Sequence, residues 1–270
     1  MRRLALPLVI LGCIALAALL AWVAVSGSFG RRAPTAPRAP EVTVPNPLPP
    51  FRKIDVSGSA DVSIVQGDAE SVSLPALARE QGLVSAEVRD GTLYIESLDH
   101  AHWWDIVLGN RDNRVPIVVT FRNVDAIVAA GTVSITASKI RAEQLRVSGA
   151  GGTSLRIDDL DARELKVTGA GALRADLAGR AAEAEITISG AGEFRGAKLA
   201  TQNANVTVAG AGRVTINAQK TLKATISGAG AVEYVGDPVV TQRVSGAGKV
   251  RRRDAAGAGM LVALQSAVLQ

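Results

Sequence analysis

The chain has 270 residues, of which 47% are hydrophobic and 3% aromatic, with 27 glycines and a single cysteine. One cysteine excludes a disulfide framework and a cysteine-based metal site, and the small, β-branched composition favours thin β layers. The net charge of +5 is misleading, because residues 1–53 carry about +6 and residues 251–270 about +2, which leaves residues 54–250 near −3. Nucleic-acid binding requires a basic face, so no nucleic-acid partner is expected.

The first predicted element, over residues 1–29, is a membrane anchor or signal segment. Arg2 and Arg3 precede an apolar run of 22 residues, Leu4–Val25, and a helix needs about 20 residues to cross a bilayer. Cleavage near Ala24-Val25-Ser26 stays open, so the chain is either held by one N-terminal transmembrane helix or secreted. Both alternatives place the rest of the chain outside the cytoplasm, in the cell envelope or periplasm.

A proline- and alanine-rich stretch, residues 30–51, predicts a semi-extended linker. The predicted β domain spans residues 52–250, with an irregular first part over 52–125 and regular repeats over 126–250. In the first part, the pair Asp90-Gly91 predicts a tight β-hairpin.

Both histidines and two of the three tryptophans lie close together in the first part, as His100, His102, Trp103 and Trp104. Three alternatives fit this segment: an insertion that caps the fold, a surface that stacks on a sugar or a partner, and a metal site completed by nearby aspartates. The cap is the favoured interpretation, and we assign no metal ligand.

Between residues 149 and 248 the motif Gly-Ala-Gly occurs six times, and its second glycine recurs every 18 to 21 residues, a period typical of solenoids. Around each copy apolar and polar residues alternate, which predicts short strands with their apolar side inward. A turn of this length has no room for a crossover helix but suits three short strands and tight corners. Corners need positive φ or close backbone packing, which favours glycine. The predicted corner residues are Gly149, Gly151, Gly169, Gly171, Gly190, Gly192, Gly210, Gly212, Gly228, Gly230, Gly246 and Gly248.

A dinucleotide-binding loop is excluded for the same motif, because no copy has the third glycine of Gly-x-Gly-x-x-Gly and no helix pattern follows. Six tandem copies instead resemble the auto-transporter adhesin, head GIN domain family of bacteria, as do IDVSGSADVSIVQGD (Ile54–Asp68) and VRDGTLYIES (Val88–Ser97). Ala60 replaces a glycine of the family pattern. The resemblance covers about residues 52–250 and implies an all-β, right-handed, three-sided parallel β-helix in an extracytoplasmic location.

The opening segment also fits the repeat. Aligning Gly58 and Ala60 with the two glycines of a copy predicts inward positions for Ile54, Val56, Val62 and Ile64.

The favoured function is a non-enzymatic, adhesin-like binding or structural module of the cell envelope, with a glycan or an envelope protein as partner. Arg174 and Arg195 are expected to align on successive turns and face outward, where they could contact an anionic glycan. No catalytic residue, cofactor or metal site is assigned, and the oligomeric state is not predicted. The tail, residues 251–270, is basic and then apolar, which predicts either a cap over the last turn or contact with a membrane surface.

Two alternatives remain. A carbohydrate-active enzyme on the same scaffold requires carboxylates from neighbouring turns to converge. Asp158, Asp159 and Asp161 share one corner loop, which predicts a solvated turn instead. The second alternative is an envelope scaffold that binds another membrane protein, through a surface that includes Trp103 and Trp104.

Overall fold

The computed structural model describes residues 46–75, 84–97 and 115–253, which form strands, turns and loops. The chain divides into two compact units, residues 1–39 and 40–270, and the described residues all belong to the second. Within these ranges no helix is long and apolar enough to cross a membrane. The predicted N-terminal helix and the apolar part of the tail lie outside the described residues.

The strands follow one another with short connections. In chain order they are β1 (Asn46–Pro47), β2 (Lys53–Gln66), β3 (Ser71–Ser73), β4 (Val84–Arg89), β5 (Thr92–Ser97), β6 (Val115–Phe121), β7 (Ala126–Ala137), β8 (Ile140–Gly151), β9 (Ser154–Gly171), β10 (Arg174–Gly190), β11 (Glu193–Gly210), β12 (Arg213–Gly228), β13 (Ala231–Val235), β14 (Val239–Ser245) and β15 (Lys249–Arg252).

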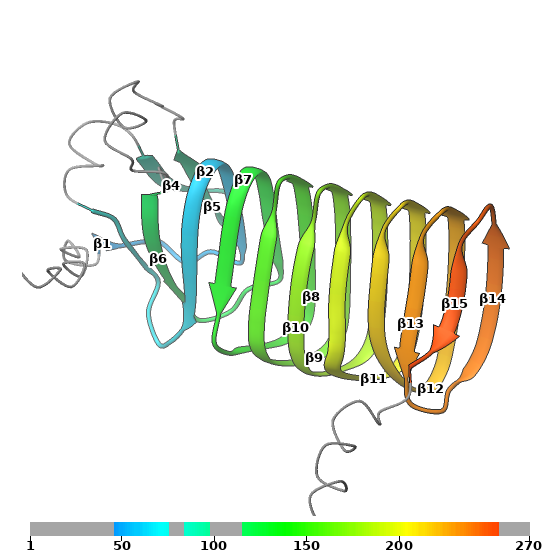
Figure 1. The fold of residues 1–270 in the computed structure, drawn as a ribbon. Helices are drawn as coiled ribbons and strands as arrows, with labels where there is room; N and C mark the ends of the chain where they lie inside the picture. The colour runs from blue at the N-terminus through cyan, green and yellow to red at the C-terminus, as the bar shows by residue number, and fades with distance from the viewer. Residues whose placement is uncertain (1–45, 76–83, 98–114, 254–270) are drawn as a thin grey trace, which may run out of the picture. The chain divides into compact units, whose positions relative to one another are not determined.

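From β7 onward the chain coils into a solenoid, with each turn lying beside the next (Figure 1). The long strands β9 to β12 each make most of one turn and pair in parallel with the turns before and after them. Parallel strands lie about 4.8 Å apart, so every residue has an equivalent neighbour one turn away. Stacked corner glycines from Gly131 to Gly246 delimit about six turns, which confirms the predicted all-β solenoid.

The opening segment joins this stack, as the sequence predicts. Strand β2 pairs in parallel with β7 over Lys53–Ile64, and Gly58 lies beside Gly131. The side chains predicted to point inward, those of Ile54, Val56, Val62 and Ile64, are all buried. The paired residues are 73 positions apart in the sequence.

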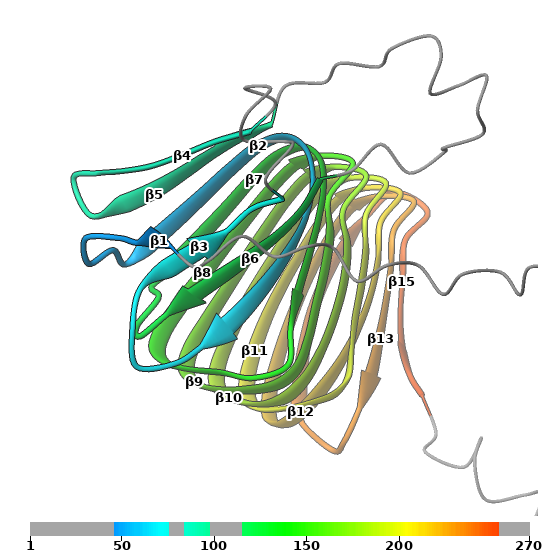
Figure 2. The same cartoon turned by 90° about the vertical axis from the view of Figure 1, so that its left-hand side faces the viewer.

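Antiparallel strands close the N-terminal end. The predicted hairpin forms between β4 and β5, and its turn residues Asp90 and Gly91 both have positive φ. The hairpin extends from the first turn beside β2 (Figure 2), while β3 pairs antiparallel with β6. At the other end, β14 pairs with β12 and β15 with β13; within the described ranges no strand covers their outer edges.

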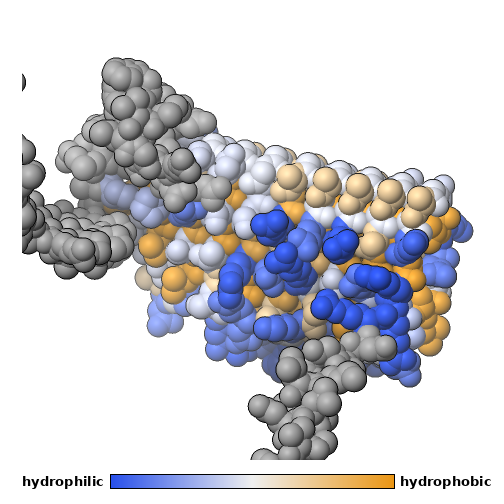
Figure 3. Space-filling model, in the orientation of Figure 1, coloured by the Kyte–Doolittle hydropathy of each residue, from blue (hydrophilic) through white to orange (hydrophobic). Residues whose placement is uncertain are grey.

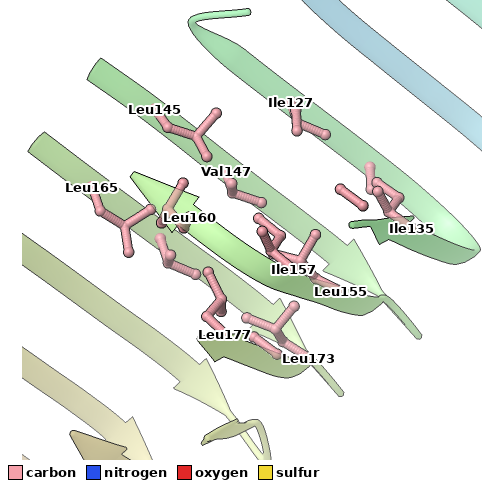
Figure 4. Packing of buried hydrophobic residues seen from close by; sticks show 14 of the residues in the cluster. Ile127, Ile135, Leu145, Val147, Leu155, Ile157, Leu160, Leu165, Leu173 and Leu177 are labelled. Atoms are coloured by element: carbon pink, nitrogen blue, oxygen red, sulfur yellow. The ribbon is translucent and has the colours of Figure 1, made fainter. Parts of the chain in front are cut away.

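The core is a column of apolar side chains inside the turns. In β9 every second residue is buried, and the alternation shifts where the chain bends after Ile157 and after Ala162. Leu145 stacks on Leu165 of the next turn, as Figure 4 shows. Each fully buried Leu, Ile or Val contributes about 1.5–3 kcal/mol, so stacked apolar columns stabilise the fold without disulfides.

The corners contain one column of glycines with positive φ, which we call the corner column. Its members are Gly58, Gly131, Gly151, Gly171, Gly190, Gly210, Gly228 and Gly246. The sequence alignment placed the second glycine of every copy in one column, and this is wrong from the third copy onward. Gly190, a first glycine, lies beside Gly171, a second glycine, because this turn has 19 residues, two fewer than the 21 that separate the second glycines Gly171 and Gly192.

The remaining glycines of the motifs have a different role. Gly149 and Gly169 lie two residues before the corner column, whereas Gly192, Gly212, Gly230 and Gly248 lie two residues after it, and all point inward or partly inward. A Cβ on Gly169 would meet the side chain of Leu173, and a Cβ on Gly192 would lie 2.8 Å from Cγ2 of Ile188. Four of these corners therefore hold a large buried side chain on one side of the bend and glycine on the other; these side chains are Leu173, Ile188, Val208 and Ile226.

Candidate binding surfaces on the outward faces

Only some of the side chains that the sequence singles out lie within the described residues. His100, His102, Trp103 and Trp104 are outside the described residues, so their cap or binding role stays a prediction. In the described ranges, no group of three or more His, Cys, Asp or Glu side chains could hold a metal ion.

Arg174 and Arg195 are exposed, but they do not align on successive turns as expected. Arg174 lies beside Glu193 and Arg195 beside Asp176, because the register differs by two residues from the alignment by second glycines. Both arginines instead contact Glu193. Arg195 donates through Nε at 3.0 Å and Nη2 at 2.9 Å, and Nε of Arg174 lies 3.8 Å from the carboxylate.

Opposite charges alternate along this face of the solenoid. One outward column runs Arg156, Asp176, Arg195, Thr215, Glu233 and Arg251 through successive turns. In-register stacking places neighbours of a column about 4.8 Å apart, and like charges directly opposite each other are destabilising. The alternation removes that repulsion, and it explains why the column carries both signs.

Towards the C-terminal end the alternation leaves an excess of cations around a hollow of about 650 Å³, which we call the C-terminal cleft. Hydrophilic side chains gather on the face that carries β13 and β15 (Figure 3). The cleft is lined by Asp176, Glu193, Arg195, Ala197, Lys198, Arg213, Thr215, Glu233, Arg251, Arg252 and Arg253. Six of these side chains are basic and three are acidic.

Glu233 organises the arginines of this cleft. The residue is only 8% exposed, and its carboxylate accepts a hydrogen bond from Nη2 of Arg251, while Nη1 of Arg253 lies 3.9 Å away. The hydrogen bond from Arg251 is the main cause that lowers the pKa of the Glu233 carboxyl below its ordinary 4.5, and the charges of Arg251, Arg253 and Arg213 add to it against the effect of burial. Glu233 is therefore ionised at neutral pH and holds two cations at the cleft.

This geometry predicts a pH-dependent stability. Because the pKa of Glu233 is lowered in the folded state, its carboxylate stabilises the fold above about pH 4.5, and this contribution is lost as the pH falls through the folded-state pKa. Glu233→Gln should lower the free energy of unfolding by about 1 kcal/mol at pH 7, and the difference from wild type should shrink towards pH 3. Urea unfolding across this pH range measures it; a difference that grows on acidification would contradict the assignment.

A second groove, of about 780 Å³, crosses the next side of the solenoid. Asp161 lies between Arg141 and Arg180 of the adjacent turns. Arg180 donates to it through Nε at 2.8 Å and Nη2 at 2.7 Å, which lowers the pKa of the Asp161 carboxyl, and the charge of Arg141 lowers it further. Asp158 pairs with Arg156 at 2.9 Å. Asp158 and Asp161 thus form ion pairs, and Asp161 faces arginines, not carboxylates, on both adjacent turns.

Carboxylates do approach each other elsewhere. Glu164 and Glu183 lie in register on adjacent turns beside a shallow hollow, where Glu183 accepts a hydrogen bond from Nδ2 of Asn203 at 2.8 Å. Near the first turn, partial burial raises the pKa of the Asp55 carboxyl, and the charge of Glu96 raises it further. Neither Asp55 nor Glu96 lines the C-terminal cleft or the second groove.

Comparisons with known proteins give one family and several solved structures. A family described as "putative auto-transporter adhesin, head GIN domain" matches residues 50–238. A "putative adhesin" from Bacteroides fragilis is 19% identical with a TM-score of 0.70, over 80% of this chain and 98% of that one. A "putative adhesin" from Parabacteroides merdae is 19% identical with a TM-score of 0.60, over 79% and 96%.

A "putative lipid binding protein" from Parabacteroides distasonis is also 19% identical, with a TM-score of 0.59 over 78% of this chain and 96% of that one. At such identities the likeness concerns the fold. No curated protein matches the sequence. The family match covers well over half of the residues, and the corner glycines and the hairpin that suggested it are in place in the structure. The chain therefore belongs to the "putative auto-transporter adhesin, head GIN domain" family.

Proposed function

We propose that this chain is a non-enzymatic module of the cell envelope that binds an extracytoplasmic ligand through the outward faces of its solenoid. The observation that carries the proposal is the pair of open, charged hollows of about 650 and 780 Å³ on those faces. In-register stacking repeats polar groups at a fixed spacing along the rod. Such a surface suits adhesion to a polymer or to another protein, and membership of an adhesin family supports the same role.

The geometry of a turn supports a finer description of the scaffold. Three runs of alternating burial per turn favour a three-sided β-helix. Parallel strands joined by a crossover within one sheet are right-handed in about 98% of cases, so we infer a right-handed coil. The N-terminal apolar run, Leu4–Val25, would hold this rod outside the cytoplasm as a membrane anchor, or direct its secretion if it is cleaved.

The enzymatic alternative has one structural argument in its favour, since Glu164 and Glu183 stand on adjacent turns. A glycosidase needs one carboxylic acid held protonated by its surroundings. Glu183 is exposed and already bound to Asn203, while Asp55, whose pKa is raised, lies outside both charged hollows. These arrangements favour binding over catalysis.

The test is a binding and hydrolysis assay with the full chain in detergent on an array of bacterial envelope glycans. We expect saturable binding to at least one glycan class and no release of reducing sugar. Cleavage that is lost in Glu183→Gln would establish the enzyme instead. Absence of glycan binding, together with an envelope-protein crosslink that disappears in Trp103→Ala, would support the scaffold alternative and overturn glycan adhesion.

A further inference from the structure

We propose that the C-terminal cleft binds an extended anionic polysaccharide, one that carries uronate, sulfate or phosphate groups along its chain. This inference rests on the proposed binding function and assigns the class of ligand. The placement of cations along the rod supports it.

The basic side chains of the cleft come from different turns. Arg195 and Lys198 belong to β11 and Arg213 to β12, while Arg251 and Arg252 belong to β15 and Arg253 directly follows it. Adjacent turns are about 4.8 Å apart, so these cations are distributed along the solenoid axis. A linear polymer lying along that axis would contact these cations one after another, because the length of one sugar unit is comparable to the spacing between adjacent turns.

Two of the three acidic side chains of the cleft are already engaged in ion pairs. Glu233 contacts Arg251 and Arg253, and Glu193 accepts two hydrogen bonds from Arg195. Six basic against three acidic side chains leave a local excess of about three positive charges. The second groove differs, because Arg141, Arg163 and Arg180 face Glu143 and Asp161 there, which leaves an excess of about one.

The lining also argues against neutral sugars and nucleic acid. No aromatic side chain is among the residues that line the cleft, so it lacks the flat apolar surface on which sugar rings or bases stack. Recognition must then come from charge and charge-assisted hydrogen bonds to the guanidinium groups, which fit carboxylate, sulfate and phosphate oxygens.

The experiment measures binding of the full chain, in detergent, to polygalacturonate, heparin, neutral dextran and duplex DNA by biolayer interferometry. We expect binding to polygalacturonate or heparin that weakens as salt is raised, and none to dextran. Arg213→Glu should weaken this binding about tenfold or more, the loss expected for a charged hydrogen bond. Lys223→Glu is the matched control, since it makes the same charge change in the same strand but lies outside the cleft.

Equal weakening by both substitutions would show a general charge effect and overturn the cleft, as would equal binding to dextran. Tighter binding to DNA than to either glycan would overturn the glycan assignment. If neither anionic glycan binds while the envelope-glycan array gives a neutral ligand, this inference fails and the proposed function stands. If the array also gives no ligand, both fail. Circular dichroism and thermal midpoints confirm that each variant is folded.

Discussion

Gly210→Val is expected to lower the free energy of unfolding by more than about 4 kcal/mol, which is exceptional for one substitution. Gly210 has φ of 123°, a conformation that costs a β-branched residue about 1–3 kcal/mol or more. Its Cβ would also lie 2.6 Å from the backbone oxygen of Gly190 in the preceding turn. Neither backbone can yield without breaking the parallel hydrogen bonds between the two turns, so the strain and the clash add.

Substitutions at two other glycines allow the strain of positive φ to be measured apart from the steric clash. Gly91 has positive φ, but a Cβ there would meet nothing within 4 Å, so Gly91→Ala should cost about 1 kcal/mol. Gly152 has no positive φ and its nearest atoms are 4.0 Å away, so Gly152→Ala should be close to neutral. Urea unfolding followed by circular dichroism measures all three. If Gly210→Val were no more destabilising than Gly91→Ala, close stacking of the corner column would not matter.

Gly169→Ile and Leu173→Gly are expected to be strongly destabilising alone and much less so together. The first overpacks the corner, because a Cβ at residue 169 would meet Leu173, and such overpacking costs about 1–3 kcal/mol or more. The second removes a fully buried leucine and leaves a cavity, at about 2–5 kcal/mol. The double variant reproduces the arrangement of the next turn, where Ile188 precedes the corner and Gly192 follows it.

A double-mutant cycle measures this compensation. We expect a favourable coupling free energy of about 2–3 kcal/mol, at the upper end for residues in contact. Pairing Gly169→Ile with Leu145→Ala serves as a control, because Leu145 is buried at another part of the turn and should not relieve the clash. Strict additivity of Gly169→Ile and Leu173→Gly would contradict the exchange of side-chain volume across the corner.

Much of the scaffold could be predicted from local patterns. Period-two alternation identified the inward residues of β2 and of β8 to β12, and Asp90-Gly91 identified the hairpin. These predictions succeeded because burial on one face of a strand and positive φ in a tight turn are recorded residue by residue. The predicted inward side chains were correct even where the predicted register was wrong, since a shift of two residues leaves the same side chains pointing inward.

The register itself, and with it the charged surface, could not be obtained in this way. The motif Gly-Ala-Gly has two glycines, and either one can take the positive φ of the corner. Which one does depends on whether the large inward side chain lies before the bend, as Ile188 does, or after it, as Leu173 does. That choice is made by packing between turns, and it moves Arg195 from the side of Arg174 to the side of Asp176.

The amino-acid sequence by itself determined the class of fold, the approximate length of a turn and the inward residues of β2 and of β8 to β12, because alternation and glycine spacing are local properties of the chain. Only the tertiary structure decided which side chains are neighbours along the outward columns. Neighbouring turns are 18 to 20 residues apart, so a one- or two-residue change in a corner alters every cross-turn pair that follows. The C-terminal cleft, built from β10 to β13, β15 and Arg253, exists only in that final register.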